Sequence, residues 1–227
     1  MQLIGLITIR YTYIMNIGVI GSEGDLGKQL SRSIKAAGFA LYEHDLKNNK
    51  VSQAEIFASC DIIHLCIPLD KFLIEKQAKD NVIIVLHDSV MSTSQLYNHS
   101  YFSGQASIVH MLMNKNNSVV IADGTAHQDS LLDHFNSLGF TPRILPLLAH
   151  DKLMAQSQAP LALLIKSLHV PLHQQYEQGL LTPSGELLMN ALDSRVLEWT
   201  PETIASILRN PMLNELINDI TKAHELK

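Results

Sequence analysis

Residues 16–27 decide the fold that we expect for this chain, and they read Asn-Ile-Gly-Val-Ile-Gly-Ser-Glu-Gly-Asp-Leu-Gly. Ile17–Ile20 is a short apolar run of β-type residues that ends in a glycine. The segment that follows, Asp25–Ala37, repeats apolar residues at the four-residue spacing of one helix face. These residues are Leu26, Leu30 and Ile34. The stretch therefore predicts a strand, a glycine-rich turn and a helix in direct succession.

The turn resembles the glycine loop that binds the diphosphate of a dinucleotide, whose pattern is Gly-x-Gly-x-x-Gly between a strand and a helix. Ser22 stands at the first glycine position, while Gly24 and Gly27 keep the last two. Gly24 lets the backbone approach a diphosphate, and Gly27 lets the helix pack closely against the strand. The start of the helix adds free N–H groups and the positive end of its dipole. We therefore predict a dinucleotide site formed by Gly21, Ser22, Gly24, Asp25, Leu26 and Gly27.

An acidic residue follows the second predicted strand, Phe39–Tyr42. Asp45 lies 18 residues after Gly27, where a carboxylate binds the ribose hydroxyls of a dinucleotide. The same charge repels a 2′-phosphate, so Asp45 favours NAD over NADP. The alternative is an ordinary strand–turn–helix unit in which the glycines serve only the turn.

Apolar runs and helical periodicity continue to alternate as far as about residue 148. Further strands are expected at 61–67, 82–86, 106–111, 119–122 and 143–147, with helices at 51–59, 70–79 and 127–138. Alternation of this kind is typical of a doubly wound α/β domain with a mostly parallel, Rossmann-type sheet. Near-continuous apolar strands such as Asp61–Ile67 suit a parallel sheet that is buried on both faces.

Beyond His150 the strand signal disappears, and only helices are expected, at 151–169, 183–197, 201–209 and 214–226. We therefore divide the chain into an N-terminal extension, 1–14, a dinucleotide-binding domain, 15–148, and a small all-helical C-terminal domain, 149–227. The extension is apolar, but it has neither the charge order of a signal peptide nor the roughly 20 apolar residues of a membrane span.

Composition excludes several classes of protein. The chain has 17 basic and 22 acidic residues, a formal net charge of −5, which argues against a nucleic-acid partner. Two cysteines, Cys60 and Cys66, are too few for a disulfide scaffold and fit a reducing cytoplasm. His169 and His173 have the spacing of a helical metal pair, but Pro171 between them is expected to disrupt the helix. No metal site is predicted.

His110 closes the predicted strand 106–111, and ligands of open α/β sheets bind at the carboxyl ends of strands. A histidine there can act as a general base, because its ordinary pKa is about 6.5. The alternative is a half-buried histidine with a backbone partner. His64, inside an apolar strand, is expected to be structural.

From about residue 16 to its end, the chain resembles the prephenate/arogenate dehydrogenases, which are NAD(P)-dependent enzymes of tyrosine synthesis. The glycine loop, the proline Pro68 that closes the third strand, and the segment 88–91 follow the order of the family's cofactor domain. His110 matches the family's catalytic histidine, and Ser89 matches a serine near the substrate. Arg195, six residues before Pro201, matches an arginine that binds a substrate carboxylate. His150-Asp151 matches a pair that opens the first C-terminal helix, although a helix cap and its neighbour would look the same.

Three positions and the length of one segment depart from the family. Met91 replaces a lysine, Met111 replaces a proline after the histidine, Ala162 replaces a histidine, and the segment 111–118 is shorter than usual. The resemblance implies catalytic roles for His110 and Ser89, with hydride transfer to NAD and loss of CO₂ from a small carboxylated substrate.

The family also implies a homodimer through the C-terminal helices, which would use Leu161, Leu164, Leu168, Leu188 and Leu192 as interface or core. Two alternatives stay open. One is a sensor or scaffold that binds NAD without turnover, which the short segment 111–118 favours. The other is a reductase for a different small carboxylated substrate.

Overall fold

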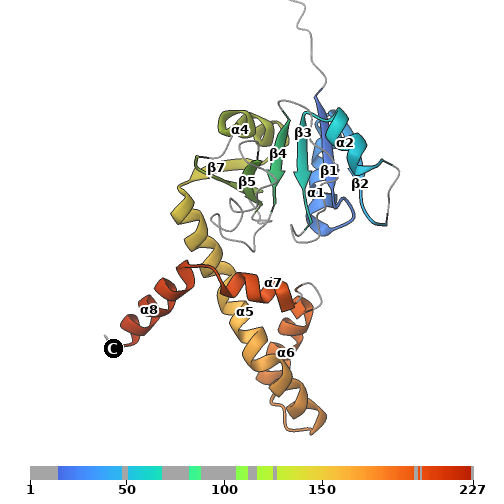
Figure 1. Ribbon diagram of the computed structural model, residues 1–227. Helices are drawn as coiled ribbons and strands as arrows, with labels where there is room; N and C mark the ends of the chain where they lie inside the picture. Colours follow the sequence, from blue (N-terminus) through green and yellow to red (C-terminus); the bar gives the residue numbers. More distant parts are fainter. Residues whose placement is uncertain are drawn as a thin grey trace, which may run out of the picture.

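A sheet with helices on both faces forms one part of the molecule, and a group of helices extends from one end of it (Figure 1). The computed structural model describes residues 15–47, 51–67, 82–87, 106–111, 117–124, 127–196, 199 and 201–225. In this described part of the chain, no helix combines the length and the apolar composition needed to cross a bilayer.

The sheet confirms the predicted doubly wound, mostly parallel architecture. Its seven strands lie in the order β2-β1-β3-β4-β5-β6-β7. They are β1 (Asn16–Ile20), β2 (Ala40–His44), β3 (Ile62–Leu65), β4 (Ile83–Leu86), β5 (Ala106–Met111), β6 (Ser118–Ala122) and β7 (Thr141–Leu145). The first five strands are parallel, while β6 pairs antiparallel with β5 and parallel with β7. Because β2 and β3 both flank β1, the direction of winding changes at β1, which is where open α/β sheets bind ligands.

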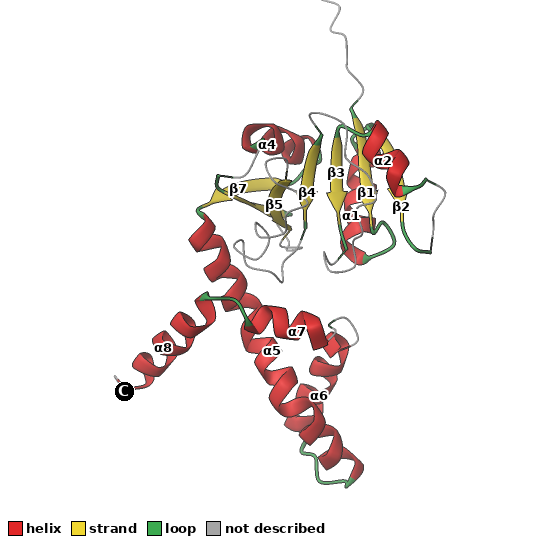
Figure 2. Ribbon diagram, in the orientation of Figure 1, coloured by secondary structure: helices red, strands yellow, loops and turns green. Residues whose placement is uncertain are grey.

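Helices α1 (Asp25–Ala36), α2 (Gln53–Ser59) and α4 (Gln128–Ser137) flank the sheet (Figure 2). Their apolar faces complete two core clusters, one on each face of the sheet. The first contains Ile20, Ile56, Leu65 and Ile108, and the second contains Val19, Leu30, Ile34, Val109 and Phe135. Ser52 caps α2 by accepting a hydrogen bond from the N–H of Glu55 at 3.1 Å. The helix expected at 70–79 and the extension 1–14 lie outside the described residues.

The C-terminal part contains α5 (Leu147–Glu177), α6 (Pro183–Val196), α7 (Pro201–Leu208) and α8 (Met212–Glu225), as the loss of strand signal predicted. The prediction was wrong about α5, which was expected at 151–169. This helix is 31 residues long and continues through Pro160 and Pro171. An interior proline removes one backbone hydrogen bond at a cost of about 3 kcal/mol, so packing by neighbouring helices must offset that loss.

The other three helices pack on α5 (Figure 1). Ala159 and Ala162 of α5 form a small core with Ile207 of α7 and Leu213 of α8. The first turn of α5 belongs instead to the sheet core, because Leu147 packs against the first cluster. The boundary at 148/149 therefore stays a prediction, and α5 is the element that connects the sheet to the helices.

Candidate functional site

The predicted cofactor and catalytic residues gather at the carboxyl edge of the parallel strands. Gly21 follows β1, Asp45 follows β2, and His110 lies near the end of β5, while His87, which was not predicted, follows β4 at the same edge. The pairing of β5 with β4 ends at Leu86 and Ile108, so His110 lies beyond the end of β4, where β5 pairs only with β6. Sequence order alone placed these residues in four separate segments, and the parallel sheet brings them to one edge.

The glycine loop is held by contacts that only glycine permits. Gly21 has a φ of +89°, and a Cβ there would lie 2.8 Å from the carbonyl oxygen of Cys66. A Cβ on Gly27 would overlap the carbonyl oxygen of Gly21, so Gly27 lets α1 start directly against the loop. Gly24 is different, because a Cβ there would have only the Gly21 oxygen within 4 Å, at 3.5 Å. Gly24 therefore has an open face, as the approach of a ligand to the backbone requires.

The loop also has polar groups that suit a diphosphate. Gly24 is the N-cap of α1 and provides no side-chain cap, so the N–H groups of the first turn remain available to an anion. Ser22 is buried, and its hydroxyl has no hydrogen-bond partner among the described residues. An orphaned buried hydroxyl beside a helix N-terminus fits a site for a polar ligand. Asp25 is exposed in the first turn, and Leu26 is half-buried.

The second strand is joined to the loop by its last residues. The carbonyl oxygen of His44 accepts hydrogen bonds from Gly21 and Ser22 at 2.9 and 3.3 Å. The Asp45 carboxylate accepts from the backbone N–H groups of Glu23 at 3.2 Å and Lys47 at 3.0 Å. Asp45 is thus fixed beside the glycine loop, as the sequence predicted. Each carboxylate oxygen accepts more than one hydrogen bond, so these contacts leave capacity for a ribose hydroxyl.

His110 meets a second histidine that comes from the helical part. Its ring packs edge to face with His150 of α5, with 6.4 Å between the ring centroids. Burial, and secondly the proximity of His150, lower the pKa of His110 to about 4. His110 is therefore a neutral imidazole at neutral pH, which is the form that accepts a proton.

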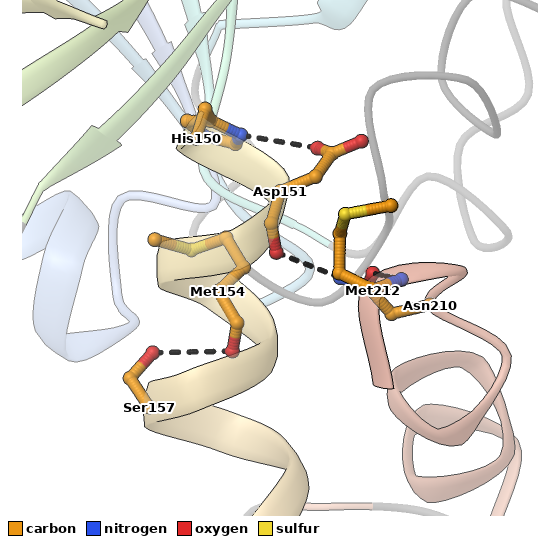
Figure 3. A network of polar contacts seen from close by, with 6 residues as sticks. All are labelled: His150, Asp151, Met154, Ser157, Asn210 and Met212. Carbon is orange, nitrogen blue, oxygen red and sulfur yellow. Dashed lines mark hydrogen bonds and ion pairs between the residues drawn. The ribbon is translucent and has the colours of Figure 1, made fainter. Parts of the chain in front are cut away.

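His150 is not a helix cap, because α5 begins at Leu147 with Pro146 as its N-cap. The His150 side chain is fully buried, and its Nδ1 lies 3.3 Å from Oδ1 of Asp151 (Figure 3). Its Nε2 has no hydrogen-bond partner among the described residues. With Nδ1 facing a carboxylate, the neutral tautomer carries its proton on Nδ1 and leaves Nε2 as an acceptor.

Asn210, between α7 and α8, joins this corner of the molecule (Figure 3). Its Nδ2 donates to the Asp151 carbonyl oxygen at 3.2 Å, and its Oδ1 accepts from the N–H of Met212 at 2.9 Å. Asn210 is only 5% exposed, so both bonds are shielded from water. The first turns of α5 and the start of α8 are therefore held together directly behind His150.

A ladder of three histidines lies beside the site. His64 of β3 is the middle member, with Nδ1 2.8 Å from Nε2 of His87 and Nε2 3.0 Å from Nε2 of His134. Burial, reinforced by the neighbouring imidazoles, lowers the pKa of His64 far below 6.5. Burial, then proximity to His110 and His134, lowers the pKa of His87 to about 3. His64 therefore belongs to a neutral, hydrogen-bonded group of three histidines, which extends the expectation that it is structural. His87, at one end of this group, lies close enough to His110 for that ring to lower the His87 pKa.

Three predicted site residues have no described side chain. Ser89 and Pro68 lie outside the described residues, so their roles stay predictions. Arg195 belongs to the last turn of α6, and Pro201 begins α7, so the expected pair does span a helix–helix junction.

Sequence reasoning missed His87, Asn210 and the burial of His150. The expectation that Pro171 disrupts the helix between His169 and His173 was wrong, because α5 stays helical at Pro171. The only available signal for His87 was its place directly after an apolar strand. Burial raises the pKa of the Cys66 thiol to about 12, and Cys60 and Cys66 form no disulfide, so neither cysteine is assigned a chemical role.

Comparison with known proteins gives a clear result at the level of the fold alone. No protein-family model and no curated protein sequence matches the chain. Among solved structures, a prephenate dehydrogenase from A. aeolicus, in complex with hydroxyphenyl propionate and NAD⁺, is similar with a TM-score of 0.68 and 15% identity. The match covers 95% of this chain and 90% of that chain. A Synechocystis arogenate dehydrogenase gives a TM-score of 0.64 at 15% identity, over 93% of this chain and 90% of that chain.

A second structure of the Aquifex aeolicus prephenate dehydrogenase gives a TM-score of 0.60 at 13% identity, over 92% of this chain and 89% of that chain. The likeness therefore includes both the sheet and the C-terminal helices that follow it in the chain. The chain has the fold of the prephenate and arogenate dehydrogenases, a doubly wound sheet followed by a helical C-terminal part.

Proposed function

We propose that this chain is an NAD-dependent dehydrogenase that oxidises prephenate or arogenate. The observation that carries the proposal is that a dinucleotide-type glycine loop and the neutral His110 lie at one carboxyl edge, in the fold that those dehydrogenases share. This edge is where an open α/β sheet binds its ligand.

The residues of the loop fit NAD. Gly24 offers an open backbone face, Gly27 brings the start of α1 against the loop, and the buried Ser22 hydroxyl lacks a partner among the described residues. Asp45 places a carboxylate beside the loop, which favours a free 2′-hydroxyl over a 2′-phosphate. A bound nicotinamide supplies the acceptor for a hydride.

His110 takes the proton in this proposal. Its pKa of about 4 keeps a ring nitrogen unprotonated at neutral pH, so it can accept the hydroxyl proton of the substrate as the carbinol carbon becomes a carbonyl. His150 packs against His110 and acts as a positioning residue, held by Asp151. By resemblance, Ser89 assists this proton transfer and Arg195 binds a substrate carboxylate through two parallel hydrogen bonds.

We further propose that the C-terminal helices pair two copies of the chain. Leu164, one of the predicted interface positions, is 38% exposed, and Leu187 on α6 is 73% exposed. Leu192 is instead fully buried and belongs to the core of one chain. Exposed leucines on neighbouring helices suit a face that a second copy covers.

One observation favours a second candidate, an NAD-binding protein without turnover. β5 ends at Met111 and β6 begins at Ser118, so only six residues connect the two strands directly after His110. A short connection provides few residues for a substrate pocket.

The test combines a calorimetric titration of the purified chain with NAD and NADP and an assay of reduced nicotinamide formed from prephenate and from arogenate. The proposal predicts tighter binding of NAD than of NADP, and turnover of one or both substrates. Binding of NAD without turnover would favour the second candidate. Absence of NAD binding would overturn both.

A further inference from the structure

We propose that His169, His173 and Asp193 form a site for one divalent transition-metal ion of the zinc class, which links α5 to α6. Ligand atoms of the three side chains lie within 4.8 Å of one another. The cluster is formed far along α5 from the first turn that carries His150, where α6 packs beside it (Figure 1). It shares no residue with the proposed dehydrogenase site.

The two histidines share one face of a continuous helix. Positions four apart on an α-helix stand one above the other, and α5 remains helical from Leu147 to Glu177. Both imidazoles therefore point toward the same residue of α6. Nε2 of His169 lies 2.9 Å from Oδ1 of Asp193, and Nε2 of His173 lies 2.7 Å from the same oxygen.

The spacing of these atoms is close to that of a metal site. Zinc binds histidine nitrogen and carboxylate oxygen at about 2.0–2.2 Å, which separates tetrahedral ligand atoms by about 3.3 Å. The observed contacts of 2.7 and 2.9 Å must therefore widen by only about half an ångström, which small side-chain rotations provide. Without a metal, both Nε2 atoms donate to one carboxylate oxygen. With a metal bound at Nε2, each neutral ring would be the tautomer that carries its one proton on Nδ1.

The donor set selects the kind of ion. Two imidazoles and one carboxylate suit zinc, cobalt or nickel, whereas magnesium and calcium prefer oxygen ligands alone. The side chains of His169, His173 and Asp193 are 25%, 40% and 35% exposed, so water can reach the ion and complete its coordination.

The consequence for the fold is a clamp on the part of α5 that contains a proline. Pro171 lies between the two histidines and cannot donate a helix hydrogen bond. A metal ion bound by His169 and His173, on either side of Pro171, and by Asp193 of α6 would hold the helix together at the proline.

The experiment uses the full chain without an affinity tag, first stripped of metal and then titrated with Co²⁺, with Zn²⁺ as competitor. We expect one Co²⁺ per chain, visible ligand-field absorption, displacement by Zn²⁺, and no displacement by Mg²⁺ or Ca²⁺. Zn²⁺ at a hundredfold excess over its Kd should raise the unfolding midpoint by about 5 °C or more.

His173→Ala and Asp193→Asn should each lower the Co²⁺ affinity at least tenfold and remove the thermal shift by Zn²⁺. The matched control is His127→Asn, which alters an exposed histidine at a φ of 59° that asparagine also adopts. Far-UV circular dichroism checks that the variants fold. No Co²⁺ spectrum in the native chain, or a spectrum that both variants retain, would overturn the proposal. Because no readout is dehydrogenase activity, the outcome is independent of the proposed function.

Discussion

At the residue scale, two glycines of the loop after β1 lack a side chain for different reasons. A Cβ on Gly27 would overlap the backbone of Gly21, whereas a Cβ on Gly24 would meet no atom closer than 3.5 Å. Gly27 therefore serves the fold, whereas the open face of Gly24 leaves room for the dinucleotide that we propose.

Substitution by alanine should separate these two roles. Gly27→Ala should lower the free energy of unfolding by about 1–3 kcal/mol, because backbone has to move. Gly24→Ala should change it by no more than about 1 kcal/mol, the difference between N-cap residues, yet lower the NAD affinity at least tenfold. Urea unfolding and calorimetric titration measure the two effects. If Gly24→Ala bound NAD as tightly as the native chain, the assignment of the open face to the diphosphate would be wrong.

Local spacing in the sequence predicts the positions of some site residues and misses the contacts of others. The places of Gly24, Gly27 and Asp45 could be predicted from spacing alone, because the loop, the helix start and the next strand are all local. The contact of His110 with His150 could not, since it depends on how a helix 40 residues later packs on the sheet.

At the element scale, Asn210 connects three helices. It lies after α7, bonds to the carbonyl of Asp151 on α5 and accepts from Met212 at the start of α8. Its removal leaves a buried carbonyl oxygen and a backbone N–H without these partners.

Asn210→Ala should therefore lower the free energy of unfolding by about 1–3 kcal/mol, the cost of unsatisfied buried polar groups. Asn214→Ala is the matched control, because Asn214 is an exposed residue near the start of α8. Chemical denaturation of both variants gives the comparison. Equal stability of the two would show that the Asn210 bonds do not hold the helices together.

Helix α5 marks the limit of prediction for elements. Its ends were predicted at 151 and 169, since prolines normally interrupt a helix, yet α5 runs from Leu147 to Glu177. Packing by α6, α7 and α8 outweighs the local penalty of Pro160 and Pro171. Tertiary packing of this kind is absent from a local pattern. The short strands of the sheet were predicted to within two residues at each end, and Ala106–Met111 at both ends.

At the scale of the whole molecule, four neutral histidines, two of them buried and two half-buried, make stability depend on pH. The pKa values of His87, His110 and His134 are lowered to about 3, 4 and 4, chiefly by burial, and the pKa of His64 is lowered well below 6.5, first by burial and then by His87 and His134. In the unfolded chain the same groups titrate near 6.5.

The unfolded chain therefore binds more protons than the folded chain between pH 6.5 and about 4. The stabilisation is complete above pH 6.5 and falls with pH through this window, by about 1.4 kcal/mol per pH unit for each histidine that stays neutral. Urea unfolding at pH 7 and pH 5 measures the loss. His134→Gln should make the loss less steep, while His127→Asn should not alter it. Equal stability at both pH values would contradict the neutral ladder.

The histidine ladder itself lay beyond sequence reasoning. His64 lies in β3, His87 directly follows β4 and His134 lies in α4, and the contact between His64 and His134 joins residues 70 positions apart. The doubly wound fold was predictable because each strand and helix has its own periodic signal in the sequence. Contacts between distant elements leave no such signal.

In the function that we propose, His110 is the proton acceptor of a dehydrogenase. Its most direct test is the rate of reduced nicotinamide formation at saturating NAD, with prephenate or arogenate, for the native chain and His110→Asn. A positioned general base contributes about 10²–10⁴-fold, so we predict a loss of at least about 100-fold in kcat with NAD affinity unchanged. A His110→Asn variant that retains most of the native rate would contradict the account.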